Sequence, residues 1–156
     1  MLSELPPFNL ETARAYFDAG RLADWIHTYL TTCHHPNVPL AEGLKLEPRW
    51  WVRPLEIPLD EIERICGPEP DMEFVVAREG FERYINILMK GFVKLEDFPP
   101  LIVYHDESGR MTIRDGSHRY ETFTRLGLPA CYAFIWFNSA EIHQNSRFAT
   151  LKTSIT

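Results

Sequence analysis

Residues 111–126, with the sequence MTIRDGSHRYETFTRL, decide the fold of this chain. Residues 111–114 predict a short strand, and the apolar spacing from His118 to Leu126 predicts a helix. Between the two, Asp115 and Gly116 predict a tight turn, because glycine adopts backbone angles that other residues resist. The chain therefore passes from strand to helix through a turn of two or three residues.

The turn places an imidazole, a guanidinium and backbone N–H groups at the start of a helix. The first amides of a helix lack partners within it, and the helix dipole favours anions at that end. A planar guanidinium also donates two parallel hydrogen bonds to a phosphate. These features predict a phosphate-binding site made of Gly116, Ser117, His118 and Arg119.

A purely structural interpretation of the same turn competes with the phosphate site. Asp115 then only initiates the turn, and Ser117 caps the helix. Arg119 pairs in that case with Glu121 or with a carboxylate at the edge of the core.

Composition limits the class of protein. The chain has 156 residues, of which 45% are hydrophobic and 13% aromatic, enough for the core of one domain. The 16 basic and 22 acidic residues give a net charge of −6, so tight nonspecific DNA binding is not expected. No apolar run is long enough to span a membrane, and residues 1–7 do not resemble a secretory signal. The odd cysteine count predicts reduced thiols in a cytoplasmic protein, at Cys33, Cys66 and Cys131.

Two amphipathic helices are predicted near the N-terminus, over residues 10–19 and 22–32, with Gly20 between them. Such a pair either packs on the main body or forms a DNA-reading helix-turn-helix. The second helix contains no arginine or lysine, which favours packing. Residues 33–48 are predicted to be a loop. Cys33-His34-His35 suggests metal ligands, but adjacent ligands point in different directions and no second cluster follows at finger spacing, so polar residues that end a helix are the preferred interpretation.

The rest of the chain alternates between short strands and helices. Trp50 and Trp51 open a strand and are expected to pack, with stacking on a base as the alternative. His105 and His143 are expected to be solvated. The pattern predicts an α+β fold with a small mixed sheet: strand 50–59, helix 60–65, helix 81–89, strand 101–104, a hairpin into strand 110–114, the helix after the turn, strand 131–137, and a polar tail from 138.

This order of elements, with PPLIVY at residues 99–104 before the DGSHR turn, resembles the ParB/sulfiredoxin superfamily. The resemblance covers residues 50–137. It implies a ParB/sulfiredoxin-like core, preceded by a helical hairpin and loop over residues 1–49 and followed by a C-terminal tail over residues 138–156.

Three branches of the superfamily differ in this turn. Sulfiredoxins place a nucleophilic cysteine where this chain has Ser117, which is a far weaker nucleophile. Partition ParB proteins bind CTP through an arginine-rich turn, of which only Arg119 is present. Free-serine kinases carry DGHHR, which matches Asp115, His118 and Arg119, while Ser117 departs from the first histidine of that motif. Their upstream glutamate matches Glu69 or Glu73 only loosely.

The resemblance implies a nucleotide-binding protein that transfers phosphate from ATP to a small hydroxylated substrate with Mg²⁺. It implies Asp115, Glu69 and Glu73 as catalytic residues and Asp115 as the metal ligand. The alternative is a ParB-like, nucleotide-regulated binding module or DNA-associated protein without catalysis. The expected partners are a nucleotide and a small substrate, without a membrane, and the exposed hairpin leaves room for a homodimer.

Overall fold

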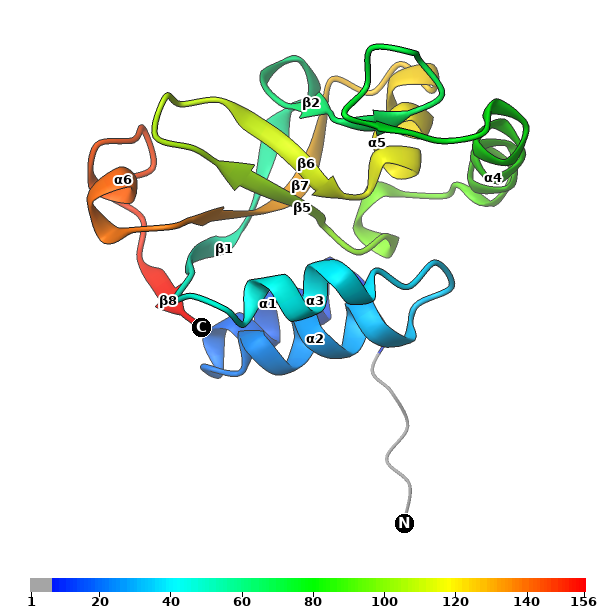
Figure 1. Ribbon diagram of the computed structural model, residues 1–156. Coiled ribbons are helices and arrows are strands. Elements are labelled where there is room, and N and C mark those ends of the chain that lie inside the picture. Colours follow the sequence, from blue (N-terminus) through cyan, green and yellow to red (C-terminus); the bar gives the residue numbers. More distant parts are fainter. Residues whose placement is uncertain (1–6) are drawn as a thin grey trace.

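A six-stranded mixed sheet lies at the centre of the protein, with helices on both faces (Figure 1). The computed structural model describes residues 7–156. The prediction about a secretory signal therefore concerns a segment that, except for Pro7, lies outside the described residues. The sheet has the order β2-β6-β5-β7-β1-β8, with β1 Trp50–Pro58, β2 Glu63–Arg64, β5 Leu101–His105, β6 Met111–Asp115, β7 Ala130–Phe137 and β8 Thr153–Ile155. A two-stranded sheet pairs β3 Cys66–Gly67 with β4 Phe74–Val75.

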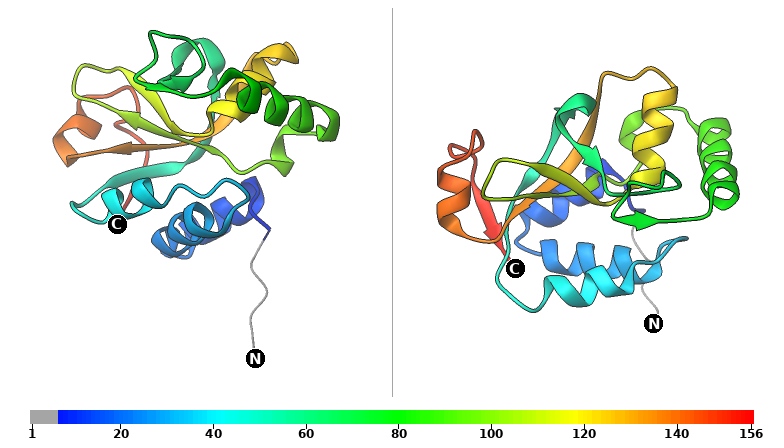
Figure 2. Two further views of the ribbon diagram at one scale, coloured as in Figure 1. Left: turned by 45° about the vertical axis from the view of Figure 1, so that its right-hand side comes forward. Right: turned by 45° about the horizontal axis from the view of Figure 1, so that its top comes forward.

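The helices form two groups (Figures 1 and 2). The first group covers one face of the sheet and contains α1 Leu10–Asp18, α2 Leu22–Thr32 and α3 Val38–Leu44. On the other side, α5 packs against the sheet and α4 packs against α5. These and the remaining helical segments are α4 Arg78–Gly91, α5 Ser117–Arg125, α6 Ala140–Gln144 and the 3₁₀ turns Leu59–Glu61 and Leu95–Asp97. The α+β class predicted from the sequence is confirmed. Within residues 7–156, no helix is long and apolar enough to cross a membrane.

The strands alternate their side chains between two hydrophobic clusters. In β5, Ile102 faces the α1–α3 layer, while Leu101 and Val103 face the layer that contains α5. In β7, Phe134 and Ile135 divide in the same way. This is the period of two that a strand covered on both faces requires.

The first two helices pack on the sheet, as the absence of basic residues in the second helix predicted. Their apolar stripe meets the sheet at Trp51, Phe134 and Trp136. Trp51 is buried, and its Nε1–H donates to the Thr156 hydroxyl at 3.0 Å, so this tryptophan is a packing residue.

The division of the chain at residues 49 and 137 stays a prediction.

Two predictions of local secondary structure were wrong. Part of the expected loop 33–48 is α3, which begins where the Asn37 side chain accepts a hydrogen bond from the Leu40 N–H at 3.2 Å. The expected helix 60–65 is a single 3₁₀ turn followed by β2, which pairs in parallel with β6 and leaves Ile62 and Ile65 buried. Isoleucines three residues apart fit both arrangements, and the run is too short for helix periodicity to decide.

The polar tail also holds regular structure. After α6 the chain returns to the sheet, and β8 pairs antiparallel with residues 50–52 of β1. His105 and His143 are buried rather than solvated, because their rings pack on Phe137 with centroids 4.8 and 5.1 Å away. One nitrogen of each ring forms a hydrogen bond with a backbone carbonyl: Nδ1 of His105 with that of Asp106, and Nε2 of His143 with that of Phe148.

Candidate functional site: the pocket at the start of α5

Gly116 joins β6 to α5 and is the residue that makes the turn. Its φ of +113° lies in the left-handed region. A Cβ atom there would approach Leu101 Cδ2 to 2.4 Å and Arg119 Nη2 to 2.9 Å. Glycine is therefore required twice, by the backbone angle and by the close packing of the turn against β5.

The first amides of α5 are free. The first backbone bond of the helix runs from the Tyr120 N–H to the Gly116 carbonyl at 2.9 Å. No side chain caps the helix, and within residues 7–156 the N–H groups of Ser117, His118 and Arg119 have no hydrogen-bond acceptor. Ser117 does not act as the cap that the structural interpretation expected, so donors and a helix dipole remain available for an anion.

A pocket of about 360 Å³ opens at this helix terminus. One wall is the turn itself, one is the end of α2 with the segment after it, and one is α4. The residues that line it are Phe8, Tyr29, Thr32, Cys33, His34, His35, Tyr84, Leu88, Phe98, Pro99, Asp115, Gly116, His118 and Arg119. The volume lies within the range of sites for small ligands.

Aromatic and imidazole rings dominate one side of the pocket. Tyr84 packs edge-on against His35 and His118, with ring centroids 4.0 and 5.0 Å apart, and the His35 and His118 rings are 5.8 Å apart. His34, His35 and Tyr84 line the pocket and were not among the site residues predicted from the sequence. The Cys33-His34-His35 triplet was conspicuous, but nothing in the sequence indicates that it faces a turn more than eighty residues later.

His118 is neutral at physiological pH. Burial lowers the pKa of its imidazole to about 4, with further lowering by the nearby His35 and by the Arg119 and Arg64 guanidinium groups. Its position at the pocket wall makes it a hydrogen-bond partner for a ligand, and an anion bound beside it would raise this pKa. Burial also raises the pKa of Cys33, so the one cysteine that lines the pocket is a thiol rather than a thiolate.

Arg119 points inward and is held by its own chain. Its Nη1 group donates to the carbonyls of Pro99 and Pro100, and Nη2 donates to the Asp115 carboxylate at 2.8 Å. The guanidinium also lies over the Tyr29 ring, 5.6 Å from its centroid. The structural interpretation correctly expected an ion pair, although the partner is Asp115 rather than Glu121. Both terminal nitrogens of Arg119 therefore already have acceptors within the chain, and its predicted contact with phosphate stays a prediction.

The donor set around Asp115 does not fit a magnesium ion held by the protein. Among residues 7–156, Asp115 is the only carboxylate that lines the pocket, and Arg119 already binds one of its oxygens. Across residues 7–156, no group of three or more His, Cys, Asp or Glu side chains is placed to hold a metal. Magnesium takes oxygen ligands, commonly one or two carboxylates together with phosphates and water. The metal role expected for Asp115 is therefore not supported.

Glu69 and Glu73 do not reach the pocket. Arg64 binds Glu69 through two hydrogen bonds, at 2.6 and 3.1 Å, which lower the pKa of this carboxyl group to about 2. A carboxylate held in this way is a poor proton acceptor. Glu73 is exposed on the loop before β4.

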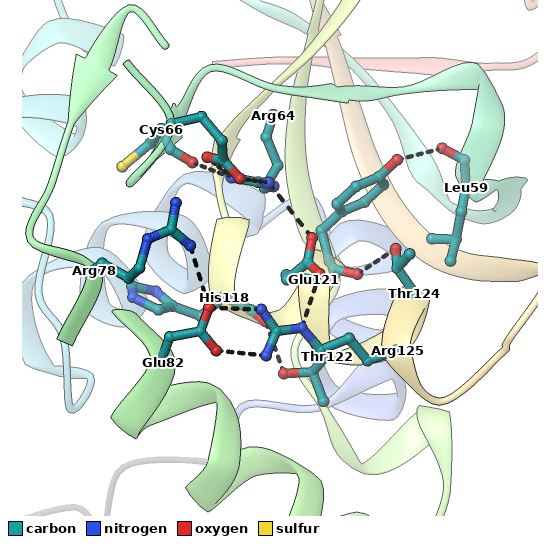
Figure 3. A network of polar contacts seen from close by, with 12 residues as sticks. Leu59, Arg64, Cys66, Arg78, Glu82, His118, Glu121, Thr122, Thr124 and Arg125 are labelled. Atoms are coloured by element: carbon teal, nitrogen blue, oxygen red, sulfur yellow. Dashed lines mark hydrogen bonds and ion pairs between the residues drawn. The ribbon is translucent and has the colours of Figure 1, made fainter. Parts of the chain in front are cut away.

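Glu69 belongs instead to a network of ion pairs that connects α4 and β2 to α5. Figure 3 shows Arg64, Glu121, Arg125 and Glu82 of this network. Arg64 contacts both Glu69 and Glu121, and Arg125 contacts both Glu121 and Glu82. Because Tyr84 lies on α4 and His118 on α5, the network fixes the two elements that carry these rings.

Comparison with solved structures returns proteins of the ParB/sulfiredoxin fold. A sulfiredoxin from Arabidopsis thaliana matches with 24% identity over 53% of this chain and 82% of that chain, at a TM-score of 0.35. A free serine kinase variant in complex with AMP matches with 19% identity over 53% of this chain and 30% of that chain, at a TM-score of 0.37. The C-terminally truncated partitioning protein ParB from Caulobacter crescentus, complexed with CTP-gamma-S, matches with 24% identity over 54% of this chain and 43% of that chain, at a TM-score of 0.34.

No protein-family description and no curated protein matches the chain. The chain spans less than half the length of the kinase and of ParB. Each of these matches covers about half of this chain, and a shared fold would not by itself decide the function.

Proposed function

We propose that the pocket at the start of α5 binds a nucleotide, with its phosphate on the free amides of Ser117, His118 and Arg119. The observation that carries this proposal is the start of α5 with its unpartnered amides, where Gly116, His118 and Arg119 line a pocket of about 360 Å³ that also has aromatic and imidazole rings in its wall. Amides at a helix terminus suit a phosphate, and the faces of Tyr84 and His35 suit a base. The AMP-bound and CTP-gamma-S-bound proteins of similar fold agree with this ligand class.

Arg119 supports this proposal indirectly. Its charge offsets that of Asp115, so this carboxylate does not leave an uncompensated negative charge beside the phosphate. Its bonds to Pro99 and Pro100 tie the turn to the start of β5. We assign it the role of holding the amides in place rather than of contacting the ligand.

Calorimetric titration of the full chain with AMP, ATP, CTP and inorganic phosphate, each with and without Mg²⁺, tests the proposal. Saturable binding of at least one nucleotide is expected, tighter than that of inorganic phosphate because the rings add contact with the base. No heat of binding for any nucleotide at millimolar concentration would overturn it.

Two substitutions of Ser117 separate the effect of charge on nucleotide affinity from the effect of side-chain size. Ser117→Asp places a carboxylate at the first residue of α5, where the helix dipole favours it, but where it repels a bound phosphate. Ser117→Asn has nearly the same size without the charge. We expect the affinity for AMP to fall at least tenfold in Ser117→Asp and much less in Ser117→Asn, with both variants folded by circular dichroism.

The narrower form of this proposal is phosphoryl transfer from ATP to a small hydroxylated acceptor. The observation that favours it is the position of Asp115 in the pocket wall, as the one carboxylate among the lining residues that the structure describes. Arg119 donates to its Oδ2, which leaves Oδ1 to accept the hydroxyl proton. The acceptor oxygen would bond to the γ-phosphorus while the bond to ADP breaks. Phosphorus NMR of ATP with serine or glycerol would detect the new phosphate ester.

Asp115→Asn distinguishes a kinase from a module that only binds. A kinase loses turnover and keeps much of its affinity for the nucleotide. If the wild-type chain binds ATP but forms no ester with any hydroxylated acceptor, the pocket is the binding module of the alternative interpretation.

A further inference from the structure

A second groove, of about 530 Å³, lies between α1, β1 and the segment that leads into β8. It shares no residue with the pocket at α5. Its position follows from the sheet: β8 pairs with residues 50–52 only, and β1 changes register between Val52 and Leu55. Residues 53–55 of β1 therefore have no pairing partner in β8, and the groove lies beside them.

Basic side chains from three elements meet at this groove. Arg14 comes from α1, Arg53 from the register change in β1, and Lys152 from the segment before β8. The one carboxylate among the lining residues is Asp18, which Arg53 holds through two hydrogen bonds at 2.9 and 3.2 Å. The hydrogen bond from Arg53 lowers the pKa of Asp18, and the charges of Lys152 and Arg14 lower it further. All three basic side chains therefore lie near the same carboxylate.

The excess positive charge is unusual for this chain. Its net charge is −6, and most of its basic side chains have a carboxylate within 4 Å. Among residues 7–156, the basic side chains without such a partner are Arg14, Lys90, Arg114 and Lys152. Two of these four line this one groove.

Arg14 is fixed in place without a carboxylate. Its Nε–H donates to the Pro54 carbonyl at 3.2 Å, and its guanidinium lies 5.3 Å from the centre of the Tyr132 ring. No hydrogen bond within residues 7–156 uses its two terminal nitrogens, so a planar pair of donors is available. That geometry matches the two oxygens of a carboxylate or a phosphate.

The remaining lining of the groove is largely apolar. Phe17 is buried beneath it, Pro54 and Leu55 form one side, and Leu151 is 41% exposed at the rim. Apolar walls with a few convergent polar groups are typical of small-molecule sites. We propose that this groove binds an organic anion with an apolar body, which places its charged group between Arg14 and Lys152 and its hydrocarbon against Pro54, Leu55 and Leu151.

NMR titration of the ¹⁵N-labelled full chain with hexanoate, hexyl phosphate and 1-hexanol tests this inference. The two anions share the hydrocarbon of the alcohol and differ from each other in the charged group. We expect saturable shifts of the amides in residues 14–20, 53–55 and 151–154 with at least one anion, and at least tenfold weaker binding of hexanol. The tighter of the two anions identifies the ligand as a carboxylate or a phosphate.

Matched pairs of substitutions complete the test. The double variant Arg14→Gln/Lys152→Gln should weaken binding of the anion at least tenfold, and Lys152→Gln, at an exposed position, at least threefold. The control variant Lys90→Gln/Arg114→Gln removes the same charge from the other two unpaired positions and should change affinity less than twofold. Absence of saturable shifts at 10 mM anion, equal binding of hexanol, or equal effects of the two double variants would overturn the inference.

Discussion

Gly116 is constrained both by its left-handed φ and by its close approach to Leu101. Two glycine substitutions can measure these two costs separately. Gly116→Ala should lower the free energy of unfolding by about 1–3 kcal/mol for the left-handed φ, with an added cost for the approach to Leu101. Gly109→Ala meets the same kind of backbone angle, φ +91°, with no atom within 4 Å of the new Cβ. Urea unfolding should therefore show a larger loss for Gly116→Ala. Equal losses would mean that the turn does not press against β5.

Arg119 and Asp115 form a buried ion pair, so the loss of one partner leaves the other charge uncompensated. Arg119→Met should destabilise the fold by about 3–5 kcal/mol in urea unfolding. Arg114→Met, a similar change in the neighbouring strand at a position without an ion pair, should cost much less. The added substitution Asp115→Asn should recover part of the loss in Arg119→Met. A loss of similar size in Arg114→Met would contradict the proposed role of Arg119 in holding the turn.

His118 gives the fold a pH dependence of defined sign. Its pKa is about 4 in the folded chain, below the ordinary histidine value of 6.5. The unfolded chain therefore binds the proton more readily, and the stability present above pH 6.5 falls as the pH drops toward 4. NMR titration of the His118 ring should show a midpoint near 4, and His118→Gln should flatten this part of the stability profile. A midpoint near 6.5 would show that the ring is not buried as described.

At the level of elements, the ion-pair network controls how firmly α4 is attached to α5. Arg125→Gln removes contacts with Glu82 and Glu121 together, and we expect a loss of about 1 kcal/mol because the groups are partly exposed. Amide hydrogen exchange in α4 should speed up. Arg83→Gln, which breaks an exposed pair within α4 only, is the control. Unchanged exchange in α4 of Arg125→Gln would show that apolar packing alone holds the helix.

Long amphipathic elements could be predicted from the sequence, and short or polar ones could not. The apolar stripes of α1, α2, α4 and α5 have enough turns to reveal their period, and the almost continuous apolar run of β7 marks a buried strand. By contrast, β2 is two residues long, and β8 is polar with partners far away in the chain. Their pairing is decided by tertiary contacts that leave no local pattern.

In the site, the parts that are contiguous in the sequence could be predicted, and the parts assembled from distant segments could not. The DGSHR turn is contiguous, so its strand, glycine and helix terminus could be predicted together. The rings that line the pocket include His35 from the segment after α2 and Tyr84 from α4. The packing of α1–α3 on the sheet brings the first segment to the turn, and the packing of α4 against α5 brings the second. The inward direction of Arg119 was equally hidden, since its acceptors are carbonyls of Pro99 and Pro100.

For the whole molecule, ligand binding and stability should be linked. A ligand that binds only the folded chain stabilises it by about 2.7 kcal/mol at one hundred times its dissociation constant. For a chain of this size, AMP at that concentration should raise the melting temperature by roughly 5–10 °C. Ser117→Asp should abolish the increase at the same AMP concentration, while Ser117→Asn should retain most of it. An equal increase in both variants would place the nucleotide elsewhere on the protein.

The amide spectrum of the ¹⁵N-labelled chain during titration with AMP measures most directly whether a phosphate binds at the first amides of α5. We predict that the N–H resonances of Ser117, His118 and Arg119 move downfield and saturate together, as expected for amides that donate to a phosphate. The rings of His35 and Tyr84 should shift at the same ligand concentrations. Nucleotide binding that leaves these three amide resonances unmoved would show that the phosphate does not lie at the start of α5.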